Sequence, residues 1–281
     1  MIRAALLIVL TLATPLRADT GIIEVDMQLV LAVDVSFSIS GDEQDIQRKG
    51  YIAAFRDPEI ISAITGGARG RISVTYLEWA GTDMQAQVVP WTLISDPLSA
   101  RAFADRLDQT PIKRSGRTSI SKALSTALGL FRDSPFVANR MVVDISSDGL
   151  NNDGRRVDRI RDMLVYHGIT INGLPLMIRP ASGPEADLDR YFQDCVVGGL
   201  GAFVAPVGNW DAFAPTLKQK LIAEIATPMP RARLLRANST LTDCLSGEKE
   251  DLRKYIEQLE DATGNNADRW RPREEDWPMP D

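Results

Sequence analysis

Three stretches of the sequence place small oxygen-bearing side chains where a strand is expected to end or a helix to begin. The first contains Asp34, Ser36 and Ser38 in LAVDVSFSIS, whose alternating spacing puts the three side chains on one side of the chain. The second contains Thr118 in SGRTSISKAL, and the third contains Asp148 in DISSDG. Hydroxyl and carboxylate oxygens suit a hard divalent cation such as Mg²⁺, which binds about six oxygens at roughly 2.1 Å. The three stretches would therefore form one cation site if the fold brings them together.

The pattern along the chain predicts a fold that can do this. Strand-like and helix-like segments alternate, which is typical of a mostly parallel sheet covered by helices. The expected strands are residues 27–35, 71–80, 86–94, 140–147, 169–178 and 202–207. The expected helices are residues 42–55, 96–109, 119–133, 155–168, 186–196 and 210–226. We therefore expect an α/β fold with a doubly wound, mostly parallel, six-stranded sheet and helices on both faces.

One strand pair is expected to be antiparallel, with the second strand at the sheet edge. Only the short polar turn GTDMQ separates residues 71–80 from 86–94, and Pro90 is least disruptive at an edge. In a doubly wound sheet, the carboxyl ends of the strands on either side of the order reversal face a common crevice. If the strands that end near Asp34 and Asp148 are neighbours there, their oxygens meet. Two carboxylates nearly neutralise a divalent ion, so an open coordination position would attract a carboxylate from another molecule.

The chain resembles the von Willebrand factor A family at these residues. The metal-ion-dependent adhesion site of that family has the pattern D-x-S-x-S, then a threonine, then an aspartate followed by glycine, and all five positions are matched here. The resemblance spans about residues 26–226. The sequences of several segments are similar to those of an uncharacterised group of exported bacterial proteins within the family. It implies that Ser36, Ser38 and Thr118 bind Mg²⁺ (or Mn²⁺ or Ca²⁺) directly, while Asp34 and Asp148 act largely through water. It also implies that the last helix, near 210–226, moves when a ligand binds. The alternative is a vestigial site whose oxygens bond one another and water.

The first residues are typical of a secretory signal peptide. Arg3 precedes the apolar run AALLIVLTLA, and cleavage is expected after Ala18. A permanent membrane anchor is the weaker interpretation because such a span needs about 20 apolar residues, and no later segment is long and apolar enough. Removal of residues 1–18 takes away Arg3 and Arg17 but no acid, so the formal charge changes from −6 to −8. An acidic protein in the periplasm or outside the cell is expected, and binding to nucleic acid is not.

Residues 227–281 are expected to form a C-terminal extension. Ser246 is a possible cap and Gly264 a possible end for a helix whose apolar face is Leu252, Tyr255, Ile256 and Leu259. That face could dock on its own domain or bind another chain. The tail from residue 269 is expected to be disordered. After export, Cys195 and Cys244 would form a disulfide or remain two separate buried thiols.

Some charged residues allow two interpretations. Asp144 and Glu78 lie within apolar strands, where a lone carboxylate is costly to bury. A structural pair with an arginine or a loop amide is the favoured role for both, although Asp144 could also orient groups at the metal site. Arg114 and Arg117 flank Thr118 and could receive an anionic ligand or remain solvated loop charges. Asn151, Asn152 and Asp153 fit turn chemistry better than a metal rim.

Several classes of function can be weighed on this basis. The leading hypothesis is a non-enzymatic exported binding protein that coordinates an acidic group of a protein partner. A structural component of a cell-envelope assembly is the alternative, and a Mg²⁺-dependent phosphate hydrolase is a third. Ser36 stands where such phosphatases usually have a second aspartate, and His167 is the single histidine, which argues against Ser-His-Asp catalysis and clustered-histidine zinc sites. No Walker A sequence appears.

Overall fold

The protein was analysed as a computed structural model that describes residues 23–179, 183–226 and 242–263. The expected signal peptide, residues 1–18, and the expected disordered tail from residue 269 lie outside the described residues, as does much of the extension, 227–241. No helix among the described residues has the length and hydropathy to cross a membrane.

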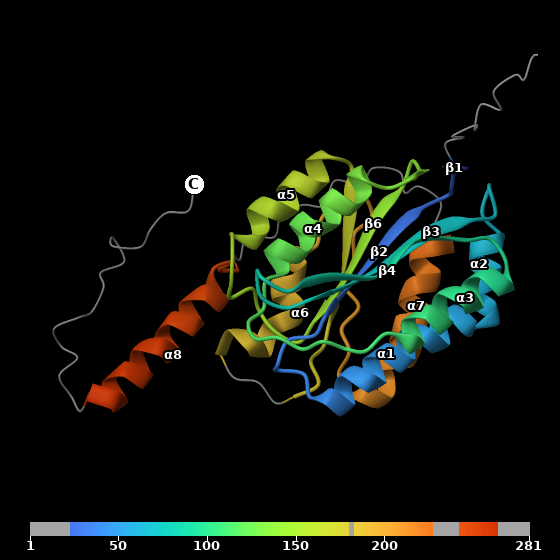
Figure 1. Cartoon of the computed structure of the whole chain (residues 1–281). Helices are drawn as coiled ribbons and strands as arrows, with labels where there is room; N and C mark the ends of the chain where they lie inside the picture. The colour runs from blue at the N-terminus through green and yellow to red at the C-terminus, as the bar shows by residue number, and fades with distance from the viewer. Residues whose placement is uncertain (1–22, 180–182, 227–241, 264–281) are drawn as a thin grey trace, which may run out of the picture.

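A five-stranded sheet forms the centre of the molecule (Figure 1). Its strand order is β4-β3-β2-β6-β7, and only the β3–β4 pair is antiparallel, as expected. The strands are β2 (Gln28–Asp34), β3 (Ile72–Trp79), β4 (Gln85–Ile94), β6 (Met141–Ser147) and β7 (Ile169–Pro175). The chain builds the sheet outward from β2 to β4 and then returns to the other side of β2 with β6. The order therefore reverses between β2 and β6, where doubly wound sheets bind their ligands.

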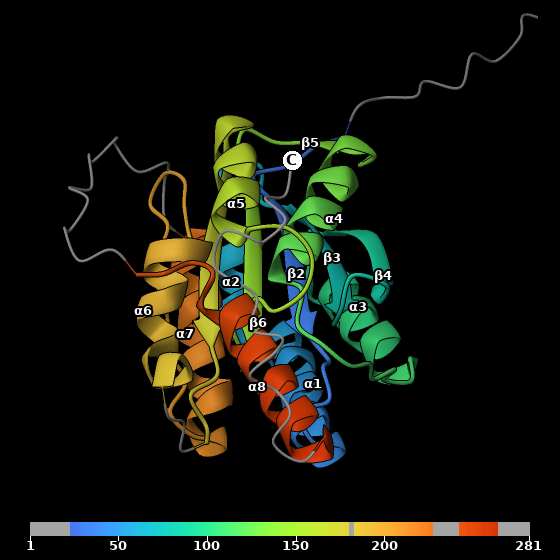
Figure 2. The same cartoon turned by 90° about the vertical axis from the view of Figure 1, so that its left-hand side faces the viewer.

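Helices cover both faces of this sheet (Figure 2). One apolar cluster packs α1, α2, α3 and α7 against the sheet, and a second packs α4, α5 and the helical turns 188–196 against the other face. The helices are α1 (Gly41–Arg56), α2 (Pro58–Thr65), α3 (Pro97–Gln109), α4 (Ile120–Arg132), α5 (Val157–Tyr166), η1 (Gly183–Asp187), α6 (Leu188–Tyr191), η2 (Phe192–Val196) and α7 (Trp210–Ala226). Helix α2, which begins at Pro58, was not anticipated from the sequence.

The expected sixth strand is the main departure from the sequence prediction. Residues 202–207 run beside β7 but form only two isolated parallel bridges, Gly173 to Val204 and Leu176 to Val207. The backbone hydrogen bonds between residues 203–207 and β7 lack the rung that residue 175 would donate to residue 205, because Pro175 has no N–H, and regular pairing is interrupted there. A separate two-residue parallel pair, β1 (Ile23–Glu24) with β5 (Phe136–Val137), was also not anticipated.

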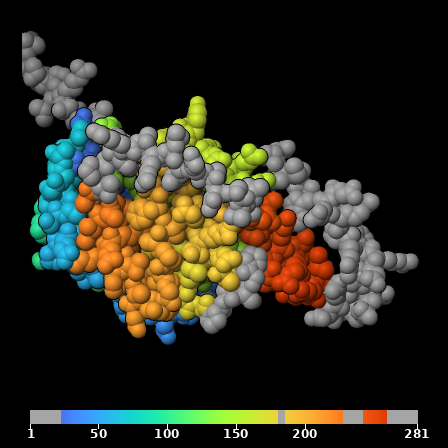
Figure 3. Space-filling view, turned by 180° about the vertical axis from the view of Figure 1, so that it is seen from behind, coloured from blue at the N-terminus to red at the C-terminus, as the bar shows by residue number. Residues whose placement is uncertain are grey.

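Helix α8 (Ser246–Thr263) extends away from the rest of the described chain (Figures 1 and 3). Its start is tied to η2 by the disulfide between Cys195 and Cys244, so the expected pairing is confirmed. Contact with the body is concentrated in its first turns, where Glu248 accepts a hydrogen bond from Asn151 at 2.7 Å. Of the apolar face expected to dock, Leu252 and Ile256 are half-buried and Tyr255 is 58% exposed. A polar first turn and a covalent bond therefore hold this helix, and the apolar face contributes less than expected.

Candidate metal centre

The D-x-S-x-S segment turns back on itself directly after β2. Asp34 is fully buried, and its Oδ1 accepts a hydrogen bond from the backbone N–H of Ser36 at 2.7 Å. Its Oδ2 accepts a hydrogen bond from the hydroxyl of Ser147 at 2.5 Å, which joins the end of β2 to the end of β6. The hydroxyls of Ser36 and Ser38 lie 2.8 Å apart. The segment thus presents two hydroxyls beside a carboxylate at the point of order reversal.

Asp148 joins this group from the turn after β6. Its Oδ1 accepts a hydrogen bond from the Ser38 hydroxyl at 2.7 Å, across 110 residues of sequence. The expected convergence of the first and third stretches is therefore present in the structure. Ser147, whose role at Asp34 was not anticipated, is the residue that the sequence prediction missed here, although it is part of the quoted DISSDG segment.

Thr118 reaches the same crevice from the loop before α4. Its backbone N–H donates to Oδ1 of Asn152 at 2.8 Å, and its carbonyl accepts from the backbone N–H of Asn152 at 2.9 Å. A Cβ atom built on Gly149 would lie 3.7 Å from the Thr118 hydroxyl, so this hydroxyl borders the Asp148 turn. Arg117, the preceding residue, has φ +63°, a left-handed conformation that is uncommon for a residue other than glycine. Backbone strain is thus stored next to the third hydroxyl.

Burial sets the electrostatics of the two carboxylates. Burial, followed by repulsion from Asp148, raises the pKa of Asp34 from 3.8 to about 7, against the lowering effect of its hydrogen bonds from Ser147 and Ser36. Burial also raises the pKa of Asp148, against a lowering effect from the Ser38 hydroxyl and from Arg179. Both acids therefore lie where a positive charge would stabilise their ionised forms.

The donor set fits a hard divalent cation. Ser36, Ser38 and Thr118 supply hydroxyls, and Asp34 and Asp148 supply carboxylates, which are the ligand types that Mg²⁺ takes in proteins. Among the described residues, no group of three or more His, Cys, Asp or Glu side chains could hold a metal. Any cation at this place would therefore depend on the hydroxyls, and softer metals that prefer thiolate or imidazole are not suited.

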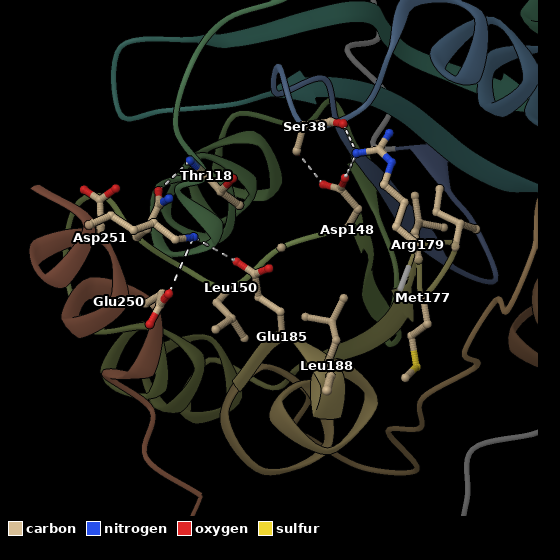
Figure 4. Close-up of a pocket in the computed structure, with 17 residues that line it drawn as sticks. Ser38, Thr118, Asp148, Leu150, Met177, Arg179, Glu185, Leu188, Glu250 and Asp251 are labelled. Atoms are coloured by element: carbon tan, nitrogen blue, oxygen red, sulfur yellow. Dashed lines mark hydrogen bonds and ion pairs between the residues drawn. The ribbon is translucent and has the colours of Figure 1, made fainter. Parts of the chain in front are cut away.

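A cavity of about 360 Å³ opens beside these residues (Figure 4). Ser38, Thr118 and Asp148 line it together with an apolar floor that includes Leu150 and Leu188. Glu250 and Asp251 line it from the first turns of α8. The start of the C-terminal helix is thus a wall of the same cavity, an arrangement that the sequence did not suggest.

Arg179 was also missed by the sequence analysis. Its Nη1 lies 3.5 Å from Oδ2 of Asp148 and donates to the carbonyl of Ser38, and its Nη2 pairs with Glu43. The Arg179 side chain is 43% exposed, whereas that of Asp148 is 6% exposed. Arg179 follows β7 in an ordinary loop sequence, which carries no signal of its approach to a site formed by β2 and β6.

The other charged and amide residues are chiefly structural. Arg114 donates to the carbonyls of Phe37 and Ile39 and lies over the Phe37 ring, 5.4 Å from its centroid, which supports the D-x-S-x-S loop. Arg117 pairs with Asp251 of α8 at 3.4 Å. Glu78 is paired with Arg48, as its burial required. In addition, Asn151 accepts a hydrogen bond from the backbone N–H of Ser121 in α4, and Asp153 accepts one from the backbone N–H of Thr82.

Comparison with known proteins identifies the fold and leaves the activity open. A family model described as a protein of unknown function, DUF1194, matches residues 24–229. No curated protein matches the chain in sequence.

Solved structures share the architecture at low sequence identity. Proximal thread matrix protein 1 from the mussel byssus is 14% identical with a TM-score of 0.52, over 73% of this chain and 48% of that chain. A von Willebrand factor type A protein from Catenulispora acidiphila is 14% identical with a TM-score of 0.52, over 72% and 43%. The pilus adhesin SpaC from Lactobacillus rhamnosus GG is 10% identical with a TM-score of 0.52, over 72% and 30%. This chain therefore spans less than half of each of these proteins, and the likeness shows a von Willebrand factor A-like fold.

Proposed function

The chain belongs to the DUF1194 family of proteins of unknown function, and on that premise we propose that it is a non-enzymatic binding protein that holds a carboxylate of a protein partner through a divalent cation. The observation that carries the proposal is the hydrogen bond of 2.7 Å between Ser38 and Asp148, which brings two distant stretches of the five-residue pattern together. The proposed cation is Mg²⁺, with Mn²⁺ or Ca²⁺ as alternatives.

Each residue of the cluster has a part in this proposal. The hydroxyls of Ser36, Ser38 and Thr118 would bind the cation, and Asp34 and Asp148 would balance its charge and orient its waters. A cation bound there supplies a positive charge with a coordination position open to an external carboxylate. The cavity bordered by Leu150, Leu188 and α8 would then select the partner by shape.

The proposed setting is the periplasm or the exterior of the cell. Two features support it: the expected signal peptide at residues 1–18, and a disulfide, which persists in oxidising surroundings. Proteins of this fold that are named as an adhesin and a matrix protein are in keeping with a binding role.

Calorimetric titration tests the metal proposal first. Mg²⁺ or Mn²⁺ should give a saturable heat with the native protein and none with Asp34→Ala. Asp45→Ala, an exposed acid on α1, is the matched control and should bind as the native protein does. A native protein that gives no heat would end the proposal.

Affinity capture tests the partner. The exported protein should retain proteins in Mg²⁺ that it loses in chelator, and Asp34→Ala should not retain them. A capture list that is the same with metal and with chelator would favour the second candidate function, a structural component of an envelope assembly. The observation behind that candidate is the 58% exposed Tyr255 on the projecting α8, and Tyr255→Ser should then reduce the capture.

A further inference from the structure

A second group of ionisable side chains lies inside the molecule, between β6 and α7. Lys220 and Glu224 of α7 and Asp144 of β6 form it, and all three side chains have no exposed surface. The ammonium nitrogen of Lys220 lies 2.6 Å from Oδ1 of Asp144 and also contacts Oε1 of Glu224. These residues are therefore held together without water at the interface between the sheet and a helix.

The contact between Lys220 and Asp144 is close but is not an ordinary hydrogen-bonded ion pair. Neither carboxylate oxygen of Asp144 has a hydrogen-bond partner among the described residues, although the nitrogen is within 2.6 Å. A distance of 2.6 Å is short enough for a hydrogen bond, so the angle between the nitrogen and the carboxylate must be unsuitable for one. The nitrogen therefore touches the carboxyl group in an arrangement that leaves both oxygen atoms of Asp144 without a hydrogen bond.

The remaining neighbours separate the roles of the two acids. Glu224 accepts a hydrogen bond from the side-chain amide of Asn172 at 2.8 Å, and Asn172 accepts one from the backbone N–H of Phe203 at 3.1 Å. The Phe203 ring lies over Lys220, 5.4 Å from ring centroid to nitrogen. Asn172 is thus occupied at both ends and Glu224 is anchored, whereas Asp144 has Lys220 as its close polar neighbour.

The charges of the three side chains make this buried arrangement unfavourable. Three ionised groups would leave one net negative charge in a site that excludes water, which is costly even when the groups are paired. Burial, followed by Asp144, raises the pKa of Glu224 to about 7, against the lowering effect of Lys220. Glu224 can therefore bind and release a proton near neutral pH. Burial lowers the pKa of Lys220, but Asp144 and Glu224 together raise it by more, so the amine needs a proton acceptor in order to react.

We propose that Lys220 and Asp144 are joined by an amide bond, an intramolecular cross-link between α7 and β6. Glu224 accepts a proton from the Lys220 ammonium, and the lone pair of the resulting amine attacks Cγ of Asp144. The bond between Nζ and Cγ forms, one C–O bond of Asp144 breaks, and Glu224 returns the proton to the departing oxygen. The ammonium gives up two protons in all, the oxygen leaves as water, and Glu224 ends in its starting state. No oxidant or further reactant is needed, and two buried charges disappear.

The cross-link bears on the last helix of the fold. Lys220 lies near the middle of α7 and Asp144 near the middle of β6. A covalent bond between them would prevent α7 from sliding along the sheet. The movement of residues 210–226 that the family resemblance implies would then be absent or confined to the ends of the helix. This inference does not depend on the proposed metal site.

Mass spectrometry of the native, reduced, mature chain tests the proposal without any variant. The measured mass should be lower than the sequence mass by one water molecule, and fragmentation should place the loss in a peptide that joins the segments around Lys220 and Asp144. Trypsin should not cut after Lys220 but should cut after Lys218, a half-buried lysine of the same helix. A full sequence mass, or a water loss located elsewhere, would overturn the proposal and leave a buried ion cluster.

Variants identify the chemistry. Lys220→Met and Asp144→Ala should show the full mass for their sequence. Asp144→Asn should lose ammonia in place of water, because the amide nitrogen becomes the leaving group. Glu224→Gln should remain largely uncross-linked while keeping the native circular dichroism spectrum. A cross-link that forms at full yield in Glu224→Gln would remove Glu224 from the mechanism.

Discussion

Asp144 and Asp148 belong to one strand and the turn that follows it, but Asp144 is completely buried, Asp148 is partly buried, and their surroundings differ completely. Asp144 faces the side-chain nitrogen of Lys220 and a second acid in a closed interior. Asp148 faces hydroxyls and a cavity that opens to solvent. The difference shows that the source of positive charge decides what a buried acid can do. The interior acid has a lysine built into the fold, whereas the acid at the crevice has the half-exposed Arg179 at 3.5 Å and borders an open cavity.

The largest expected effect concerns the interior cluster. Lys220→Met leaves Asp144 and Glu224 buried without the nitrogen that contacts both of them, and it should lower the free energy of unfolding by about 3–5 kcal/mol. Lys218→Met is the control, because Lys218 pairs at 2.9 Å with Asp57 and Glu59 at the surface, and its loss should amount to about 1 kcal/mol or less. Denaturant unfolding measures both. Equal losses of stability in the two variants would mean that the burial of Lys220 does not increase its contribution over that of Lys218.

In the crevice, in contrast to the interior, a cation added from solution should increase the stability of the protein. Mg²⁺ at about 100 times its dissociation constant should stabilise the native protein by about 2.7 kcal/mol. Asp148→Asn should lose this gain but should be at least as stable as the native protein without metal, because it relieves the repulsion at Asp34. Thermal unfolding with Mg²⁺ and with chelator gives both values. If metal-free Asp148→Asn is much less stable than the metal-free native protein, the charge of Asp148 is already compensated within the fold, as that of Asp144 is.

The pH dependence of the metal-free protein is a further point of contrast. The pKa of Asp34 is raised from 3.8 to about 7, so the folded state binds a proton that the unfolded state releases between these values. Stability should therefore fall as pH rises through this range. Asp34→Asn should lack this part of the pH profile. An unchanged profile in Asp34→Asn would assign the dependence to other groups.

The smallest expected effect belongs to Arg179. Its guanidinium lies 3.5 Å from Asp148 and competes with a metal for that carboxylate. Arg179→Gln should tighten Mg²⁺ binding about fivefold, equivalent to about 1 kcal/mol. Arg132→Gln, at an exposed pair with Asp133, should leave the affinity unchanged. Weaker binding in Arg179→Gln would mean that the arginine supports the site instead of competing for it.

Much of the architecture was predictable because local periodicity encodes it. The alternation of strands and helices, the antiparallel edge pair and the convergence of Asp34, Ser38 and Asp148 all follow from patterns within short segments. The expected sixth strand was wrong because Pro175 of β7 has no N–H to donate to it, so the pairing that composition alone favoured is interrupted. Segment patterns therefore located the crevice but overstated the regularity of the sheet edge.

Partners brought together over long distances were not predictable. Lys220 and Glu224 are four residues apart in a helix, a spacing typical of a solvated surface pair, yet both are completely buried. Arg179 has no sequence signal at all. Asp144 was expected to pair with an arginine or a loop amide, and its partner is a lysine on the last helix of the sheet domain. Sequence showed that a charge must be compensated, and the fold determined which residue does so.

The bond between Cys195 and Cys244 also ties one wall of the cavity to the redox state of its surroundings. A thiol pair stays open in reducing surroundings and closes in oxidising ones. Until it closes, nothing covalent fixes the start of α8 beside the cavity, and the recess has one wall fewer. A newly made chain would thus present a shallower, less selective surface than the finished protein, and recognition would be completed only after oxidation.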